Sequence, residues 1–249
     1  MPRVITLISC LLIFSAGLAA EADDLLTRAA AAEARQDARA ALELYYSALR
    51  AEPQNAFILQ KIARQYSDLV EEQSGPEEKK RYAQTALDYA LRAVALEPDN
   101  PVNVLSLAIC HGRLAVYSDT RTKVQYSRLI KEEAERALAL DPDYAWAHHV
   151  LGRWHYEVAG LGRTARFFVR LFYGGLPDAS HAEAIRHLER AVALEPDALA
   201  HRLELGFAHK AAGNLTAARG HLEAGLAMPA QEKFDVQAQA RARSVLAGL

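Results

Sequence analysis

The sequence predicts an all-α fold, a right-handed helical solenoid of about five helical hairpins followed by a C-terminal capping helix. One helix ending recurs along the chain, as SALRAEPQ, RAVALEPD, RALALDPD and again RAVALEPD. Its prolines lie 45, 44 and 54 residues apart, at Pro53, Pro98, Pro142 and Pro196. Apolar residues precede each proline at the spacing of an amphipathic helix. A near-regular return of one helix and one stop indicates stacked copies of a single helical unit.

The stop itself follows from the chemistry of proline. In SHAEAIRHLERAVALEPD, the residues Ala184, Leu188 and Ala191 fall on one helical face, and Pro196 ends the helix. Proline disfavours an α conformation in the residue before it, so Glu195 should leave the helix and the chain should turn back. An acidic residue also precedes the proline of the other three copies, so all four ends should have the same geometry.

Small residues mark the places where paired helices touch. An alanine stands five positions before each proline, at Ala48, Ala93, Ala137 and Ala191. The next helix carries Leu-Gly at residues 151–152 and 205–206, and Ile-Ala or Leu-Ala in the two earlier copies. Small side chains let helices approach closely, and with the terminal proline they match the tetratricopeptide pattern. We therefore expect tetratricopeptide-like hairpins, with a looser first hairpin over residues 22–52 and a capping helix from Glu232.

The longest insertion into this pattern joins the two helices of the fourth unit as AGLGRTARFFVRLFYGGLPDAS. It predicts a short helix over residues 163–173, ended by Gly174 and Gly175, that combines cations with aromatics. The residues that carry this character are Arg163, Arg166, Phe167, Phe168, Arg170 and Phe172. Two uses are open for the aromatics: burial as a lid over the groove, which we favour, or contact with a membrane interface.

The first nineteen residues predict a signal peptide, which leaves residues 20–249 as the tetratricopeptide-like domain. Arg3 precedes an apolar run from Val4 to Leu18, and Gly17 and Ala19 are the small pair before a cleavage site. The mature protein would then be periplasmic or secreted. The alternative is an uncleaved membrane anchor, although the run is shorter than the roughly twenty residues that span a bilayer.

Composition and motifs exclude several classes of function. The balance of 29 Lys+Arg against 31 Asp+Glu gives no basic field for nucleic acid. Cys110, alone after the predicted cleavage, lies in an apolar helical segment and is expected to be a small buried hydrophobe. His111, His155 and His209 recur at equivalent repeat positions, which packing between hairpins explains. With no G-x-S-x-G, H-E-x-x-H or C-x-x-C motif, we predict no enzyme, no cofactor and no metal site.

The candidate binding groove follows from the repeat alignment, because the first helix of each tetratricopeptide hairpin lines the concave face. It comprises Arg64, Arg113, Trp146, His149, Arg153, Tyr156, Phe207 and Lys210. The cations would form a discontinuous basic column suited to an acidic peptide or an anionic headgroup. In the alternative, Asp68, Glu157 and other carboxylates pair with these cations and keep the groove soluble. We expect the main ligand site around Trp146, His149, Arg153 and Tyr156.

Several stretches resemble a known family when they are taken in order. The segment HHVLGRWHYEVAGLGRTARFF is followed by the rest of the insert, an LP turn and HAEAIRHLERAVALEPD, and the chain closes on AAGNLTAARGHLEAGLAMPAQEKFDVQAQARA. This order resembles the regulator of microtubule dynamics family over roughly residues 56–249. The resemblance implies an α-helical solenoid without catalytic activity. In eukaryotes it implies association with microtubules and, in membrane-anchored members, with organelle contacts and lipids.

The predicted signal peptide and the Ala- and Arg-rich composition look instead like an exported bacterial homologue. The fold should transfer from the family, whereas the microtubule activity should not. The first functional hypothesis is a non-enzymatic protein-interaction scaffold of the bacterial envelope that binds a protein or peptide partner, expected to be acidic, in the concave groove. The alternative is a binder of an anionic lipid or other amphipathic small ligand through the groove and the insert. Nucleic acid and microtubules are not expected partners.

Overall fold

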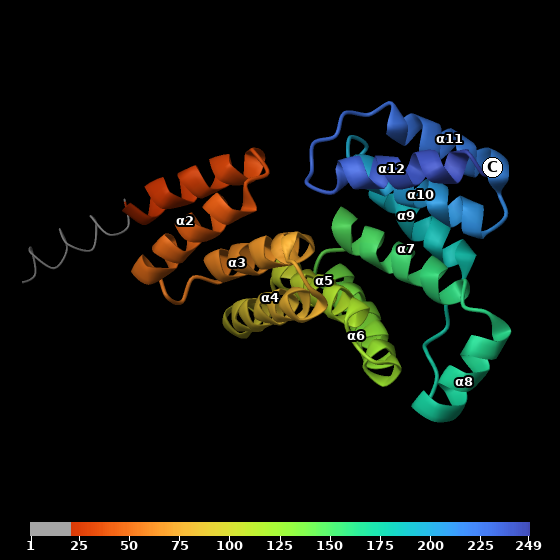
Figure 1. Ribbon diagram of the computed structural model, residues 1–249, viewed down its shortest axis with the longest axis horizontal. Helices are drawn as coiled ribbons and strands as arrows, with labels where there is room; N and C mark the ends of the chain where they lie inside the picture. The colour runs from red at the N-terminus through yellow and green to blue at the C-terminus, as the bar shows by residue number, and fades with distance from the viewer. Residues whose placement is uncertain (1–20) are drawn as a thin grey trace, which may run out of the picture. The chain divides into compact units, whose positions relative to one another are not determined.

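Every regular element in residues 21–249, the part of the chain that the structure describes, is helical. Figure 1 shows the computed structural model as a succession of helical hairpins. The all-α fold class predicted from the sequence is confirmed. The predicted signal peptide, residues 1–19, lies outside the described residues.

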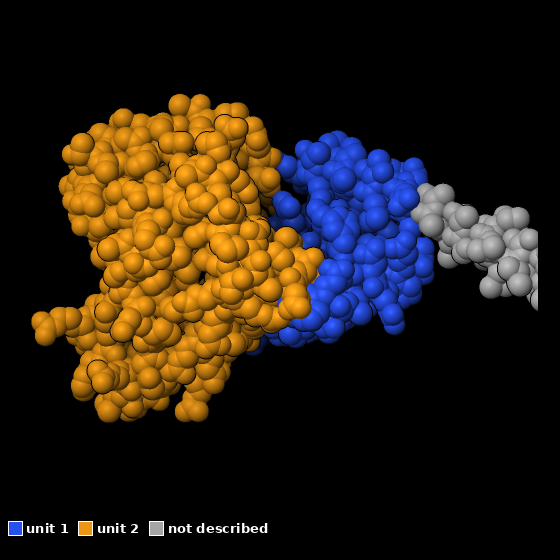
Figure 2. Space-filling model, turned by 180° about the vertical axis from the view of Figure 1, so that it is seen from behind, with its two compact units in different colours: residues 1–98 blue, residues 99–249 orange. Residues whose placement is uncertain are grey.

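The chain divides into two compact units, Met1–Pro98 and Asp99–Leu249 (Figure 2). The division falls in the turn at Pro98, the second of the four repeated prolines. Each unit therefore contains whole hairpins, because the boundary coincides with the end of a repeat.

The unit Met1–Pro98 contains two hairpins in its described part. Its elements are a helix over residues 21–34, α2 (Ala38–Ala51), α3 (Ala56–Leu69), the 3-10 turn η1 (Val70–Glu72) and α4 (Pro76–Leu96). The side chains of Asp37 and Asn55 cap α2 and α3 by accepting backbone N–H groups at 3.0 and 3.2 Å. Tyr45, Ile58 and Ile62 are buried in one apolar core to which α2 and α3 both contribute, so this core joins the two hairpins.

The unit Asp99–Leu249 contains three hairpins and a final helix. Its elements are α5 (Pro101–Val116), α6 (Thr120–Leu140), α7 (Ala145–Ala159), α8 (Arg163–Tyr173), α9 (His181–Leu194), α10 (Leu199–Ala211), α11 (Leu215–Leu226) and α12 (Asp235–Leu246). The hairpins pair α5 with α6, α7 with α9, and α10 with α11. The helix α8 lies in the connection of the second pair, and α12 packs on α10 and α11 as the predicted cap.

The four repeat ends share one backbone hydrogen bond. The acidic residue before each proline has left the helix, and its N–H donates to the carbonyl of the alanine four residues earlier, at 2.9–3.0 Å. The donors are Glu52, Glu97, Asp141 and Glu195, and the acceptors are Ala48, Ala93, Ala137 and Ala191. These alanines are fully buried, which confirms that they lie at helix contacts. The proline therefore ends the helix without leaving the last N–H unpaired.

Gly152 and Gly206 meet the facing helix of their hairpins. A Cβ added to Gly152 would lie 2.6 Å from Leu188 Cγ, and one added to Gly206 would lie 2.7 Å from Leu222 Cγ. No larger residue fits at either position without displacing a core leucine. The close helix approach predicted from the two Leu-Gly pairs is therefore present.

Candidate functional site

The face shared by α7 and α10 carries most of the predicted groove residues. Trp146 begins this face on α7, where its ring packs against His149 and His201 with ring centroids 5.1 and 4.6 Å apart. His149, Tyr156 and Phe207 are buried, whereas Trp146 is half-buried and Arg153 and Lys210 are exposed. The accessible part of the predicted groove is therefore smaller than the sequence suggested, and it centres on Trp146 and Arg153.

A buried carboxylate organises the interior of this face. The Tyr156 hydroxyl donates to Glu204 Oε2 at 2.5 Å, and Arg241 donates to Glu204 Oε1 at 3.2 Å. The guanidinium of Arg241 lies over the Phe207 ring, 3.8 Å from its centroid. Burial and the neighbouring Glu204 carboxylate raise the pKa of Tyr156, so its hydroxyl remains a donor. The network fixes α12 against α7 and α10.

The C-terminal segment thus covers part of the predicted groove. Arg241 contacts Tyr156 and Phe207, and Phe234 receives the guanidinium of Arg113 at 4.7 Å from its ring centroid. Sequence reasoning missed Glu204, Phe234 and Arg241. The one available signal was Glu204 itself, a charged residue within the otherwise apolar helical stretch LELGFA.

Carboxylates pair with two of the predicted groove cations. Arg153 Nε lies 2.8 Å from Glu157 on the same helix, and its Nη1 lies 3.9 Å from Glu204. Arg64 lies on α3 in the unit Met1–Pro98, where Asp68 is 4.0 Å away. Pairing of Arg64 with Asp68 and of Arg153 with Glu157 is the alternative that the sequence analysis left open for these cations.

A shallow, open hollow of about 640 Å³ lies in the unit Met1–Pro98, at the repeat turn Glu52–Ala56 beside Glu97. Arg64 does not line it.

The insert forms the predicted helix α8, but its aromatic face is exposed. Phe167, Phe168, Leu171 and Phe172 are 49–62% exposed, so the prediction of a buried aromatic lid is wrong. The physical reason is that α8 packs weakly on its neighbours: it meets α6, and it reaches the end of α7 through hydrogen bonds from Arg166. Figure 1 shows it standing off the hairpins of its unit.

Arginines hold both ends of α8. Arg166 donates to the carbonyls of Val158 and Ala159 in the last turn of α7, at 2.9 and 3.1 Å. Arg128 of α6 donates to the Tyr173 and Gly175 carbonyls at the other end. Gly174 closes the helix at φ +78°, a left-handed conformation that favours glycine. The aromatic face is therefore presented by a helix that is tied at each terminus.

Buried histidines link helices within and between the hairpins of this unit. His148 Nδ1 lies 2.8 Å from His187 Nδ1, and His149 Nδ1 lies 2.9 Å from His201 Nδ1. Burial lowers the pKa of all four rings, so they are neutral at pH 7. His111, His155 and His209, which the repeat alignment assigned to packing, are buried as well.

The described residues contain no helix that combines the length and apolar character needed to cross a bilayer.

Comparison of folds matches the chain to a thermophilic TPR protein of Thermus thermophilus, with a TM-score of 0.66 and 22% identity, over 91% of this chain and 99% of that one. The match confirms the tetratricopeptide-like solenoid class predicted from the sequence.

Two sequence relatives are regulators of microtubule dynamics by name. Regulator of microtubule dynamics protein 1 of Mus musculus is 28% identical over 200 residues, which are 80% of this chain and 66% of that protein. Regulator of microtubule dynamics protein 3 of Xenopus laevis is 30% identical over 172 residues, 69% of this chain and 37% of that protein. The model of the family described as regulator of microtubule dynamics protein 1-3 matches residues 18–249. Since that match spans nearly the whole chain, the protein belongs to the regulator of microtubule dynamics family, as its insert and terminal helix predicted.

Proposed function

We propose that this chain is a non-enzymatic protein-interaction scaffold that binds a partner segment on the face shared by α7 and α10. The tetratricopeptide-like fold, which is typical of such scaffolds, supports the general role. The observation that carries the site is Trp146, a half-buried indole two helical turns before the exposed Arg153 on the same helix. An aromatic and a cation along one helix offer both contact area and charge to an extended peptide.

The partner that fits this face is an acidic segment. Arg153 and Lys210 are both exposed, and the Arg153 guanidinium is already positioned by Glu157 and Glu204. A ligand carboxylate can exchange with the exposed Glu157, whereas Glu204 is buried and stays paired with Tyr156 and Arg241. The binding geometry is therefore set by the buried network, and the charge is supplied by the exposed cations.

The test begins with a photo-reactive phenylalanine analogue at position 157, which is exposed on α7, and the same analogue at Leu140 on α6 as the control. Partners that cross-link only from position 157 are then measured against Trp146→Ala and Arg153→Ala at low and high salt. Trp146→Ala should abolish binding, and Arg153→Ala should weaken it and reduce its salt dependence. Full affinity in a folded Trp146→Ala protein would mean that this indole only packs the repeat.

We place this scaffold in the periplasm or outside the cell, because the first nineteen residues have the pattern of a signal peptide. Microtubule regulation, which the names of the relatives state, is therefore not carried over to this chain. A further reason is that this chain covers only 66% and 37% of the two relatives. N-terminal sequencing of the purified protein should find a start near Ala20. If the protein is found in the membrane fraction with Met1 intact, the N-terminal segment is an uncleaved anchor and not a signal peptide.

A second candidate function is binding to an anionic lipid surface through α8. Its support is the exposed face formed by Phe167, Phe168, Leu171 and Phe172, with Arg163 and Arg170 on the same short helix. Aromatics that enter a headgroup region beside arginines that meet lipid phosphates are typical of an interfacial helix. Arg166 and Arg128 already hold the two ends of α8, so the helix is folded before it meets a membrane. Binding therefore does not have to supply the free energy of folding it.

Vesicle flotation separates this candidate from the scaffold. The protein should float with vesicles of phosphatidylserine and phosphatidylcholine and less with phosphatidylcholine alone. Phe168→Glu should remove flotation, whereas Val236→Glu, at an exposed apolar position on α12, should not change it. Equal flotation of both variants and the parent protein would exclude α8 as the contact.

A further inference from the structure

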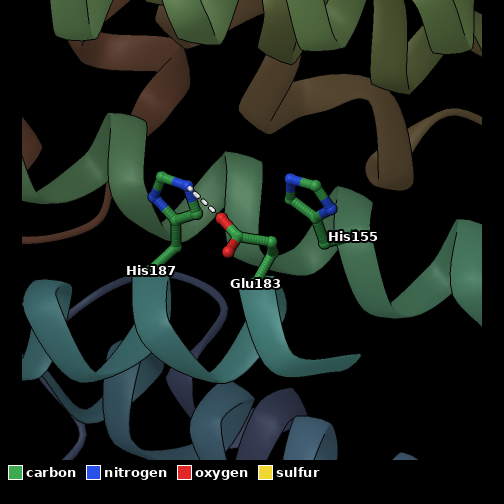
Figure 3. A group of neighbouring side chains, drawn as sticks. All are labelled: His155, Glu183 and His187. Carbon is green, nitrogen blue, oxygen red and sulfur yellow. Dashed lines mark ion pairs between the residues drawn. The ribbon is translucent and has the colours of Figure 1, made fainter. Parts of the chain in front are cut away.

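Three side chains between α7 and α9 lie close enough to share one cation. Glu183 and His187 stand one turn apart on α9, and His155 faces them from α7. One ligand atom of each residue lies within 4.8 Å of the others, and His187 Nε2 is 3.9 Å from Glu183 Oε2. Figure 3 shows the two imidazole rings side by side, with the carboxylate of Glu183 directed between them.

The two rings lie parallel to each other. Their planes differ by only 11°, with centroids 5.9 Å apart, so the rings form a stacked pair. The lone pair of an imidazole nitrogen lies in the ring plane, so both side chains must rotate before their nitrogens point at one ion. Both rings are more than nine-tenths buried.

The hydrogen bonds of His187 leave its Nε2 as an acceptor. Arg186 donates to this nitrogen at 2.9 Å, so the proton of the neutral ring is on Nδ1, which donates to His148 Nδ1. His148 in turn donates from Nε2 to the Pro142 carbonyl at 3.0 Å. A histidine held through its other nitrogen in this way has the orientation and tautomer of a metal ligand.

His155 has no comparable structural task. Its Nδ1 is buried without a hydrogen-bond partner, and its ring touches Trp154 edge-on. A buried ring nitrogen left unpaired costs stability, so a packing role alone does not favour histidine at this position. Lys131 and Glu135, which face His155 from α6, are paired with each other.

A cation already occupies the space between these ligands. Arg186 Nη2 lies 2.6 Å from Glu183 Oε2 and 2.9 Å from His187 Nε2. The Arg186 side chain is 60% exposed and can swing into solvent, which would leave both atoms free for a metal. The site is thus complementary to positive charge, and its present occupant is easily displaced.

We propose that His155, Glu183 and His187 bind one Zn²⁺ ion, with the fourth position open to water or a further ligand. Two imidazoles and one carboxylate are ligands that zinc accepts, at about 2.0–2.2 Å each. In a tetrahedral site with such bonds the ligand atoms are ~3.3 Å apart, so small side-chain rotations must close the present spacing. The ion would join α7 to α9, the two helices that α8 connects.

The test uses the full chain without an affinity tag, freed of metal by a chelator and titrated with Zn²⁺ against a chromophoric zinc indicator. We expect one Zn²⁺ per chain, a rise in melting temperature and a tetrahedral absorption spectrum when Co²⁺ is used instead. His155→Gln and His187→Gln should each weaken Zn²⁺ binding by at least ~100-fold, since loss of a mere supporting partner already costs about 10- to 100-fold.

The control is His209→Gln, which alters the stacked pair His209–His221 in the next hairpin and should bind Zn²⁺ like the parent. Arg186→Ala should bind more tightly, because the competing guanidinium is gone. Melting curves in chelator identify any variant that fails to fold, and Glu183→Gln at the half-exposed ligand then serves in its place. Stoichiometric Zn²⁺ binding that survives in His155→Gln and Glu183→Gln would overturn the proposal.

Discussion

Ala191 shows, at the scale of the residue, how the repeat depends on side chains of little volume. It is fully buried in the α9 contact, and its carbonyl accepts the N–H of Glu195 that ends the helix. An alanine stands at the same position in all four copies, so the close packing of the paired helices requires a small side chain there.

Ala191→Leu should therefore lower the free energy of unfolding by about 1–3 kcal/mol, because the added carbons must be accommodated in a filled contact. Ala182→Leu is the matched control, since Ala182 is exposed on the same helix. Urea denaturation measures both. Equal stability of Ala191→Leu and the parent would require a different alignment of the repeats.

The buried pair His149–His201 should make stability depend on pH. Burial lowers the pKa of His149 well below 6.5, and His201 and Arg153 lower it further; burial also lowers the pKa of His201, against the effect of Glu195. The unfolded chain then takes up protons before the folded one as the pH falls. The contribution of this pair to the free energy of unfolding is thus fully present above about pH 6.5 and is lost as the pH falls below it.

Denaturation at a series of pH values from about 8 to 5 tests this dependence. His149→Gln should reduce the loss of stability between about pH 7 and 5, because one group that must be kept neutral is removed. Ala182→Gln, at an exposed position on α9 that carries no titratable group, is the control and should keep the slope of the parent. An identical slope in all three proteins would assign the dependence to other groups.

The helix α8 shows, at the scale of the element, that an insertion can be ordered without being buried. Its order comes from arginines that reach backbone carbonyls at either end. Hydrogen bonds from a charged donor stabilise such a contact more than neutral ones do, which compensates for the weak packing.

Arg128→Ala should release the C-terminal end of α8. The Tyr173 and Gly175 carbonyls would lose their donor, so amide hydrogen exchange should accelerate over residues 170–176 while α6 itself stays protected. Arg121→Ala, exposed on the same helix α6, should leave the exchange of α8 unchanged. Unaltered exchange in Arg128→Ala would mean that packing, rather than the arginine, orders the insert.

Elements of this fold differ in how well the sequence predicts them. The four helix ends and the alanine contacts could be predicted because each depends on a proline and a small residue a few positions apart. The exposure of α8 could not, since aromatic side chains are buried in most folds and nothing local signals the exception. The contact of Arg241 with Glu204 joins residues 37 positions apart, and a sequence pattern carries no information on which charges will meet.

At the scale of the whole molecule, stability in a repeat protein is a sum of units and their neighbours. The helix α12 contributes the cap of the unit Asp99–Leu249 through its contacts with α10 and α11. Its loss would leave Glu204 buried with one partner fewer and Phe207 without the guanidinium that covers it.

A chain that stops after Ala230 should therefore be less stable in the unit Asp99–Leu249, by at least the ~1–3 kcal/mol of an unpaired buried polar group. Amides of α2, α3 and α4 should keep the protection of the full chain, because these helices belong to the unit Met1–Pro98, which has an apolar core of its own. Hydrogen exchange on both chains measures the difference. A uniform loss of protection over both units would show that they unfold together.

The shared hydrogen bond at the repeat ends has an evolutionary consequence. Each junction is completed by main-chain atoms and one alanine, so a gene duplicated or spliced between two such prolines would join segments whose backbone bonds are already satisfied. Copies of this kind can be gained, lost or exchanged without redesigning the neighbours at the seam. The identity of RAVALEPD at two distant places in the chain is what such copying would leave behind.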